Sequence, residues 1–238
     1  MLTTFTAFAP YLRILQALFV GFVVGLFVLM LILIPFGSFE EDVFFQPIPA
    51  LLTGIVYYSS LLTFSYLLLR PKILNRSFGW RIFLKIFALF IFFFITIDAL
   101  STWIKFPSLS EPIFDNQLQQ NPGIFFLSVV LVGPILEELV FRGAIVSYLL
   151  AHSTRVSALL FSSFLFGMIH FSLDQIILAS IAGIFLGYAY MKSKNIIVPI
   201  FFTCSTTEYT FSSNSMGIFL QFLSYLTCNN SSKSRCTF

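Results

Sequence analysis

The chain is a succession of long apolar runs separated by short polar segments. A helix needs about 20 apolar residues to cross the hydrocarbon of a bilayer, and most of the runs approach that length. This pattern predicts an all-α fold, a polytopic membrane helical bundle with about six to seven transmembrane helices. The predicted spans are Ile14–Ile34, Ile48–Leu69, Ile82–Ile104, Gly123–Leu150, Val156–Phe171, Gln175–Tyr190 and a weaker one that begins near Ile196.

Three of the predicted spans depart from a plain apolar helix. The run Gly123–Leu150 contains Gly133 and Pro134, where we expect a kink, because proline cannot donate the backbone hydrogen bond of a helix interior. Val156–Phe171 and Gln175–Tyr190 are short for a full crossing. We therefore expect these two to tilt inward or to lie buried among other helices.

The composition agrees with a membrane protein. Hydrophobic residues make up 58% of the chain and charged residues only 10%, with a mean hydropathy of +0.95. Soluble domains carry about 25% charged residues, so an ordinary soluble domain is excluded. The net charge of +3 is small. We expect the lipid bilayer as the main surrounding of the chain and no nucleic acid as a partner.

Most basic residues fall on alternate sides of the successive spans, while the acidic residues collect on the other side together with Lys105. The positive-inside rule then places the N-terminus in the cytoplasm. We expect an integral, multi-pass protein of a bacterial cell membrane. The bases that follow the alternation are Arg13, Arg70, Lys72, Arg76, Arg81, Lys85, Arg155, Lys192 and Lys194.

The composition changes near Phe202. Residues 1–202 form the predicted transmembrane helical domain, and residues 203–238 form an atypical tail rich in Ser, Thr, Asn and Cys. All three cysteines, Cys204, Cys228 and Cys236, lie in this tail, and their spacing matches no zinc or redox motif. We assign them no catalytic role.

Charged residues inside predicted spans are costly and usually functional. Glu138 and Arg142 lie four residues apart in the order that favours an ion pair on a helix, so we expect them to pair. Glu137 is rotated by about 100° from Glu138 on the same helix and has no partner nearby in the sequence. A carboxylate in that position is a candidate general base. The alternative is a structural salt bridge with a spare carboxylate.

The next span ends with a second candidate group. Phe166 and His170 lie one helical turn apart, so the phenyl ring can hold the imidazole, and Asp174 could accept a ring proton and fix the tautomer. His152 lies beside Arg155 in a short loop and is expected to be solvated. Asp98 is expected near the outer interface.

These residues resemble the first two motifs of the CPBP family, also called Abi, which includes the type II CAAX prenyl endopeptidases. The motifs are Glu137-Glu138-x-x-x-Arg142 and Phe166-x-x-x-His170. The resemblance covers roughly Val129–Phe202. Its flanks are Pro134, Phe141-Arg142-Gly143 and Ile197-Val198-Pro199-Ile200.

The resemblance implies a helical membrane core around a polar cavity, in which Glu137 and His170 activate a water for attack on a peptide carbonyl. Glu138, Arg142 and Phe166 would shape the site. A third motif, His-x-x-x-Asn or His-x-x-x-Asp, is implied as the stabiliser of the oxyanion. It is absent: Thr203 and Thr207 occupy these positions. A degenerate homologue or a shifted reading frame near Phe202 would explain the departure.

The sequence therefore predicts an intramembrane endopeptidase that acts on a membrane-associated peptide or protein and is impaired by the missing third motif. We expect no cofactor and no tightly held metal, because catalytic zinc normally takes three protein ligands and Glu138 is expected to pair with Arg142. Two alternatives stay open. One is a non-catalytic peptide-binding or bacteriocin-immunity protein, and the other is a small transporter with a Glu/His proton relay.

Overall fold

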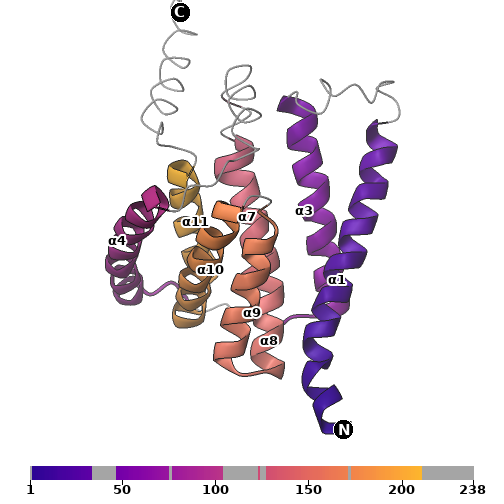
Figure 1. Ribbon diagram of the computed structural model, residues 1–238, viewed down its shortest axis with the longest axis horizontal. Coiled ribbons are helices and arrows are strands. Elements are labelled where there is room, and N and C mark those ends of the chain that lie inside the picture. The colour runs from indigo at the N-terminus through magenta and orange to yellow at the C-terminus, as the bar shows by residue number, and fades with distance from the viewer. Residues whose placement is uncertain are drawn as a thin grey trace, which may run out of the picture.

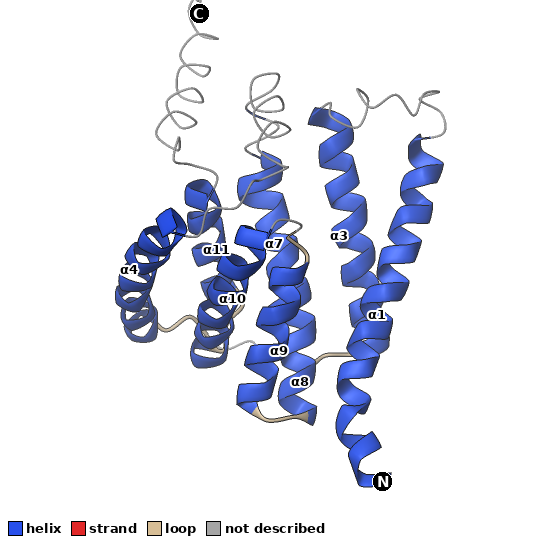
Figure 2. Ribbon diagram, viewed as in Figure 1, coloured by secondary structure: helices blue, strands red, loops and turns tan. Residues whose placement is uncertain are grey.

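The computed structural model describes residues 2–33, 47–74, 77–103, 123, 127–170 and 173–210. These residues form helices and connecting turns, with no strand among them (Figure 2). The predicted all-α fold is therefore confirmed. The helices are α1 (Leu2–Leu33), α3 (Pro47–Leu69), α4 (Trp80–Trp103), η2 (Leu127–Val132), α7 (Gly133–Glu138), η3 (Leu139–Val146), α8 (Ser147–His152), α9 (Arg155–Met168), α10 (Leu173–Ser193) and α11 (Ile197–Thr210).

The helices form a bundle in which successive passes alternate in direction (Figure 1). The α1–α3 hairpin lies on one side and α4 on the other, with the remaining helices between them. The pieces η2, α7, η3 and α8 follow one another without a break, so they make one pass, Leu127–His152. This pass corresponds to the predicted span Gly123–Leu150.

Three of the helices have the length and composition to cross a membrane by themselves. They contain the segments Phe8–Leu31, Trp80–Ile97 and Gln175–Ser193. Three shorter apolar helices accompany them, at Gly54–Leu69, Arg155–Met168 and Ile197–Thr206. The chain is thus an integral membrane protein with a helical bundle, as the apolar runs predict.

The hairpin of α1 and α3 is held by small residues. Gly21 and Gly25 have the GxxxG spacing that lets two membrane helices approach closely. A Cβ at Gly21 would lie 2.9 Å from Leu61 Cα, and one at Gly25 would lie 2.5 Å from the Ser60 hydroxyl oxygen. Ser60 also donates a hydrogen bond of 2.9 Å to the Gly21 carbonyl. The close fit fixes the position of α3 against α1.

The central pass is the core of the bundle. From Val140 to Leu149 every side chain is buried, because neighbouring helices surround this segment. Two π-helical stretches, η2 and η3, flank the short α-helix α7 that carries the two glutamates. Pro134 lies at the start of α7, where its missing N–H interrupts the regular hydrogen-bond pattern. π-Helical turns are rare and concentrate at functional sites.

Aromatic rings fasten α11 to α4 and α10. The ring of Phe202 on α11 lies 4.5 Å from that of Phe90 on α4, 5.9 Å from that of Phe83 and 5.7 Å from that of Phe185 on α10, between centroids. Aromatic pairs at these distances stabilise a fold beyond the gain from burying their apolar area. Phe202 has no exposed surface. The packed helix continues past residue 202, where the composition changes, and carries Thr203 into the core.

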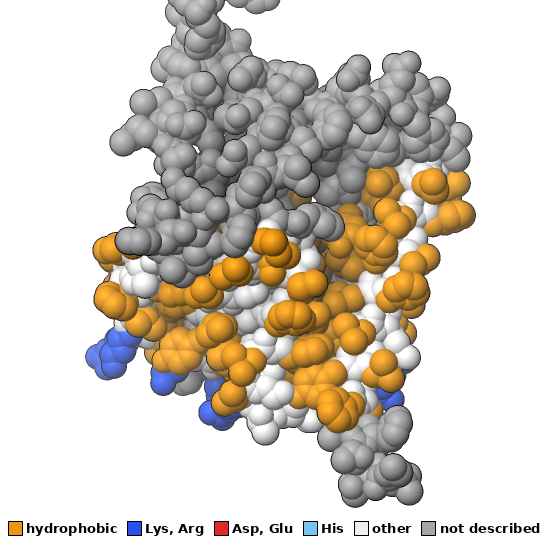
Figure 3. Space-filling view, in the orientation of Figure 1, with side chains coloured by type: hydrophobic (Ala, Val, Ile, Leu, Met, Phe, Trp, Pro, Cys, Tyr) orange, Lys and Arg blue, Asp and Glu red, His pale blue; other side chains and the backbone are white. Residues whose placement is uncertain are grey.

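On the face of the bundle that Figure 3 shows, the basic side chains gather at one end. The visible Lys and Arg side chains lie along the lower edge in Figure 3, below a surface with many hydrophobic side chains. Arg70 and Lys194 follow the ends of α3 and α10 with φ of 47° and 53°. Each closes its helix with a backbone hydrogen bond, to Tyr66 and Tyr190 respectively. Positive charge is favourable at both places, because a helix C-terminus carries a partial negative charge.

Candidate functional site

Glu138 and Arg142 form a buried ion pair, as their spacing predicts. The Arg142 Nη1 atom lies 2.7 Å from Glu138 Oε1, and the two side chains are 1% and 0% exposed. Arg142 Nη2 donates a further hydrogen bond of 3.3 Å to the carbonyl oxygen of Gly183 on α10. Since a lone buried charge is very costly, each partner depends on the other for its burial.

Thr203 on α11 completes this arrangement. Its hydroxyl donates to Glu138 Oε1 at 2.7 Å and also lies 2.9 Å from the Pro199 carbonyl oxygen. Glu138 Oε1 thus receives donors from two helices, whereas Oε2 is buried without a hydrogen-bond partner among the described residues. We call Glu138, Arg142, Thr203 and the Gly183 carbonyl the closed cluster. It ties the central pass to α10 and α11.

Glu137 has a different environment from its neighbour. Its side chain is half-buried, and its Oε1 atom accepts a hydrogen bond of 2.6 Å from the Tyr58 hydroxyl on α3. This length is typical of an O–H group that donates to an ionised carboxylate. Oε2 of Glu137 receives no hydrogen bond from the described residues. The carboxylate is therefore held at one oxygen, and no described residue donates a hydrogen bond to the other.

His170 lies just after the end of α9, half-buried. Its Nδ1 atom lies 2.9 Å from the carbonyl oxygen of Phe166, and the two rings are 5.2 Å apart in an edge arrangement. A carbonyl oxygen only accepts hydrogen bonds, so Nδ1 carries the proton. In the neutral ring this leaves Nε2 with its lone pair, which can accept a proton or hold a water.

Phe166 joins the two halves of the site. Its ring lies under the Arg142 guanidinium, with Arg142 Cζ 4.4 Å from the ring centroid. The same ring also contacts the His170 imidazole edge-on. The Phe141 ring meets it edge-on at 5.1 Å. A cation over an aromatic face is attracted by the ring's quadrupole. The residue predicted to shape the site therefore contacts both the closed cluster and the histidine.

Several predicted site residues are not part of this arrangement as described. The side chains of Asp98, Asp174 and Thr207 lie outside the described part of the chain. His152 is exposed, as predicted, with Nδ1 2.8 Å from the Tyr148 carbonyl oxygen. Thr203 lies in the site, but its hydroxyl is bound to Glu138. Cys204, beside it, is half-buried and forms no disulfide.

A metal centre is not assembled by the described residues. Among them, no group of three His, Cys, Asp or Glu side chains has a geometry that could hold a metal ion. The expectation of a metal-free site stays a prediction.

Neither Tyr58 nor Gly183 was predicted from the sequence as a site residue. Tyr58 belongs to a run of four polar side chains, Tyr57-Tyr58-Ser59-Ser60, inside an otherwise apolar span. Polar groups inside a span mark internal faces, so this run was a usable signal. The Gly183 carbonyl carried no such signal, because every backbone unit has one.

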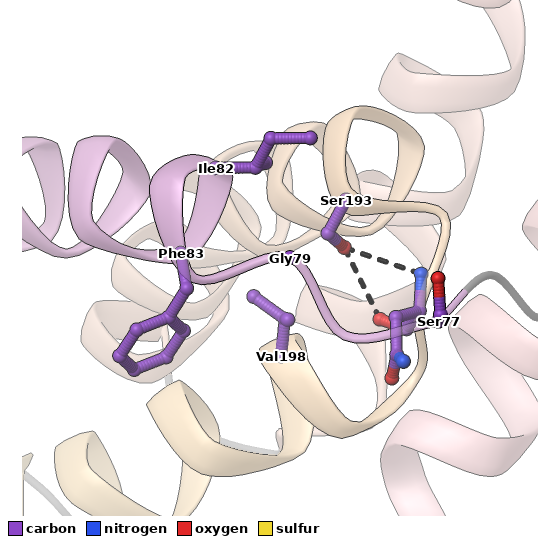
Figure 4. A pocket seen from close by; sticks show the side chains of 7 residues that line it. Ser77, Gly79, Ile82, Phe83, Ser193 and Val198 are labelled. Carbon is purple, nitrogen blue, oxygen red and sulfur yellow. Dashed lines mark hydrogen bonds between the residues drawn. The ribbon is translucent and has the colours of Figure 1, made fainter.

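A separate small cavity lies at the basic end of the bundle (Figure 4). It has a volume of about 130 Å³ and lies between the start of α4, the end of α10 and the start of α11. In Figure 4 the Ser193 hydroxyl at its wall is bonded to the backbone of Asn195. None of the predicted site residues lines it. Its lining consists of Ser77, Gly79, Ile82, Phe83, Ser193, Asn195 and Val198.

Comparisons with known proteins agree with the motifs. Residues 119–206 match the model of a family described as type II CAAX prenyl endopeptidase Rce1-like. A Bacillus subtilis (strain 168) protein named "Putative membrane peptidase YdiL" is 39% identical over 84 residues, which make up 35% of this chain. The match spans 34% of that relative's length, about a third. No solved structure matches the chain. The family match includes the glutamate pair and the histidine, and this segment of the chain is similar to the type II CAAX prenyl endopeptidases.

Proposed function

We propose that the chain is an intramembrane endopeptidase of the CAAX prenyl protease type, in which Glu137 activates a water with the help of His170. The observation that carries this proposal is the unequal environment of the two glutamates. Glu138 is fully buried and bound to Arg142 and Thr203, whereas Glu137 is half-buried with Oε2 available. The family match adds the reaction type, and the substrate would be a membrane-associated peptide or protein.

The proposed reaction begins with a water between Glu137 Oε2 and the scissile carbonyl. Oε2 takes one proton as the water oxygen bonds to the carbonyl carbon, and the C=O electron pair moves onto oxygen. The carbonyl re-forms as the C–N bond breaks, and the proton on Glu137 passes to the leaving nitrogen. His170 Nε2 would hold or orient the water. The products are a carboxylic acid and an amine, and no resident metal takes part.

We propose that this chain hydrolyses its peptide substrate slowly. An oxyanion needs preorganised donors, and the position that the resemblance assigns to a histidine holds Thr203. The hydroxyl of Thr203 is bound to Glu138 at 2.7 Å, so it could serve an oxyanion only by leaving that carboxylate. We further propose that the N-terminus and the basic end of the bundle face the cytoplasm of a bacterial cell, in accordance with the positive-inside rule.

The test uses Glu137→Gln, which keeps the shape of the side chain and removes the base. The purified full chain in detergent would be incubated with a quenched-fluorescence peptide that ends in a prenylated Cys and three further residues, and with its unprenylated form. We expect slow cleavage by the unaltered chain and a loss of about a hundredfold or more in Glu137→Gln. Glu111→Gln, in a polar segment outside the predicted spans, is the matched control and should cleave normally. Cleavage that survives Glu137→Gln would contradict the proposal.

The bond between Thr203 and Glu138 favours one second candidate, a non-catalytic protein that binds a peptide or confers immunity. Such a protein would bind the same peptide and leave it intact, with and without Glu137. A transporter would instead move protons or solute across liposomes. Cleavage that depends on Glu137 would exclude the binding protein.

A further inference from the structure

Among the described residues, Tyr58 donates a hydrogen bond to the proposed base. It lies on α3, outside the segment 119–206 that matches the family model. Its hydroxyl donates to Glu137 Oε1 at 2.6 Å across a sequence separation of 79 residues. The proposed base is therefore held by a part of the chain that the family segment does not include.

The hydrogen bond fixes the carboxylate in a defined rotation. Glu137 has three rotatable bonds, and its Oε2 atom has no hydrogen bond from the described residues. With Oε1 held by Tyr58, the rotation of the carboxylate is restricted, so Oε2 favours one direction. A general base must lie within hydrogen-bond reach of the proton that it removes, so this orientation matters for the proposed step.

The neighbours of Tyr58 hold it firmly. The adjacent Tyr57 ring meets the Tyr58 ring edge-on at 5.3 Å between centroids, and Phe22 on α1 meets Tyr57 at 6.1 Å. One turn beyond, the glycine contacts of α1 with Leu61 and Ser60 keep α3 in place. The α1–α3 hairpin thus presents a rigid donor to the central pass, and rigid support is what precise positioning requires.

We propose that Tyr58 is a positioning residue for the hydrolysis, and that the α1–α3 hairpin therefore completes the active site. Tyr58 acts through Glu137: it holds Oε1 so that Oε2 meets the water. This proposal rests on the proposed function of Glu137. It assigns a role in the reaction to the N-terminal hairpin, which lies outside the segment that matches the family model.

The test compares Tyr58→Phe with Tyr57→Phe in the full chain, with the prenylated peptide as substrate. Both variants keep the ring and remove one hydroxyl, and the Tyr57 hydroxyl forms no hydrogen bond among the described residues. Removing a partner that orients a metal ligand costs about ten- to hundredfold in activity, and we take the same scale for a partner that orients a general base. We expect Tyr58→Phe to lower kcat by that factor with KM unchanged within about twofold. Tyr57→Phe should behave as the unaltered chain.

A conservative replacement separates positioning from packing. 4-Aminophenylalanine at position 58 keeps an N–H donor where the hydroxyl was, so it should restore kcat to within about threefold of the unaltered chain. The kcat of the 4-aminophenylalanine protein can be compared with that of the unaltered chain even if Tyr58→Phe is less stable. An equal loss with both replacements would show that the donor is irrelevant and overturn the proposal.

The outcomes for the two proposals differ. If Glu137→Gln abolishes cleavage while Tyr58→Phe keeps the full kcat, the proposed function stands and the role of Tyr58 is wrong. If the unaltered chain shows no cleavage that depends on Glu137, the proposed function fails and the role of Tyr58 fails with it.

Discussion

Two neighbouring carboxylates on α7 have opposite surroundings. Glu138 has no exposed surface and belongs to the closed cluster, where Arg142, Thr203 and the Gly183 carbonyl join three passes of the bundle. Glu137 is half-buried, and Tyr58 is the described residue that donates a hydrogen bond to it. Rotation by about 100° along the helix is enough to point one acid into the core and the other toward a different helix.

The two environments suit different roles, with Glu138 in the stability of the fold and Glu137 in the proposed reaction. A buried ion pair with several hydrogen bonds resists change, because removal of any member leaves the others uncompensated. A carboxylate with one oxygen available can exchange a proton and bind a water. The closed cluster therefore fixes the frame, and the neighbouring acid is left for the proposed reaction. Substitutions in the two regions test this division.

The largest effect on stability is expected from Arg142→Ala. It would leave Glu138 as an unpaired buried charge, and breaking such a pair costs about 3–5 kcal/mol in the free energy of unfolding. Glu137→Gln should cost less than about 1 kcal/mol, since it can keep an acceptor for Tyr58. Equilibrium unfolding in mixed detergent and SDS micelles measures both. Equal losses would make Glu137 a structural residue and remove the contrast.

The double variant Thr203→His with Thr207→Asn supplies the residues that the third motif lacks. Preorganised donors at a developing oxyanion are worth about 3–4 kcal/mol, so we expect cleavage of the prenylated peptide to rise by about a hundred- to a thousandfold. The increase must disappear when Glu137→Gln is added. Equal Glu137-dependent rates in the double variant and the unaltered chain would show that the native chain is not impaired.

Thr203→Val tests the closed cluster alone. It keeps the branched shape and removes the donor to Glu138. Hydrogen bonds to charged groups contribute about 1.5–3 kcal/mol, so the free energy of unfolding should fall by that amount. The kcat should change little, because the Thr203 hydroxyl serves Glu138 and not the water. A loss of activity with no loss of stability would place Thr203 in the chemistry instead.

The smallest effect is expected from Phe166→Leu, which lies between the two regions. It removes the ring from under Arg142 and from beside His170. A buried cation–π contact contributes about 2 kcal/mol, which sets the expected loss of stability. A looser His170 should also reduce kcat severalfold. Phe164→Leu, on the exposed face of α9, is the control for stability and activity. If only stability changes, Phe166 supports the cluster without positioning the histidine.

Much of the fold could be predicted from the apolar runs, because a helix that crosses a membrane needs a minimum length of apolar residues. Helix α3 ends at Leu69 as predicted, and α9 and α10 begin within two residues of the predicted positions. The break at Gly133 and Pro134 was also visible, although it takes the form of adjacent π-helical stretches. The change of composition at Phe202 did not mark the end of a helix, since α11 continues to Thr210.

The sequence by itself determined the contacts that lie within one helical turn. Glu138 with Arg142 and Phe166 with His170 are four residues apart, and the helix repeat alone brings each pair together. The tertiary structure decided the rest: Tyr58 with Glu137 over 79 residues, Thr203 with Glu138 over 65 and Gly183 with Arg142 over 41. These contacts depend on where each helix crosses its neighbour and how it is rotated. The close packing of glycines and phenylalanines sets these crossing points and rotations, and they cannot be read from a short stretch of sequence.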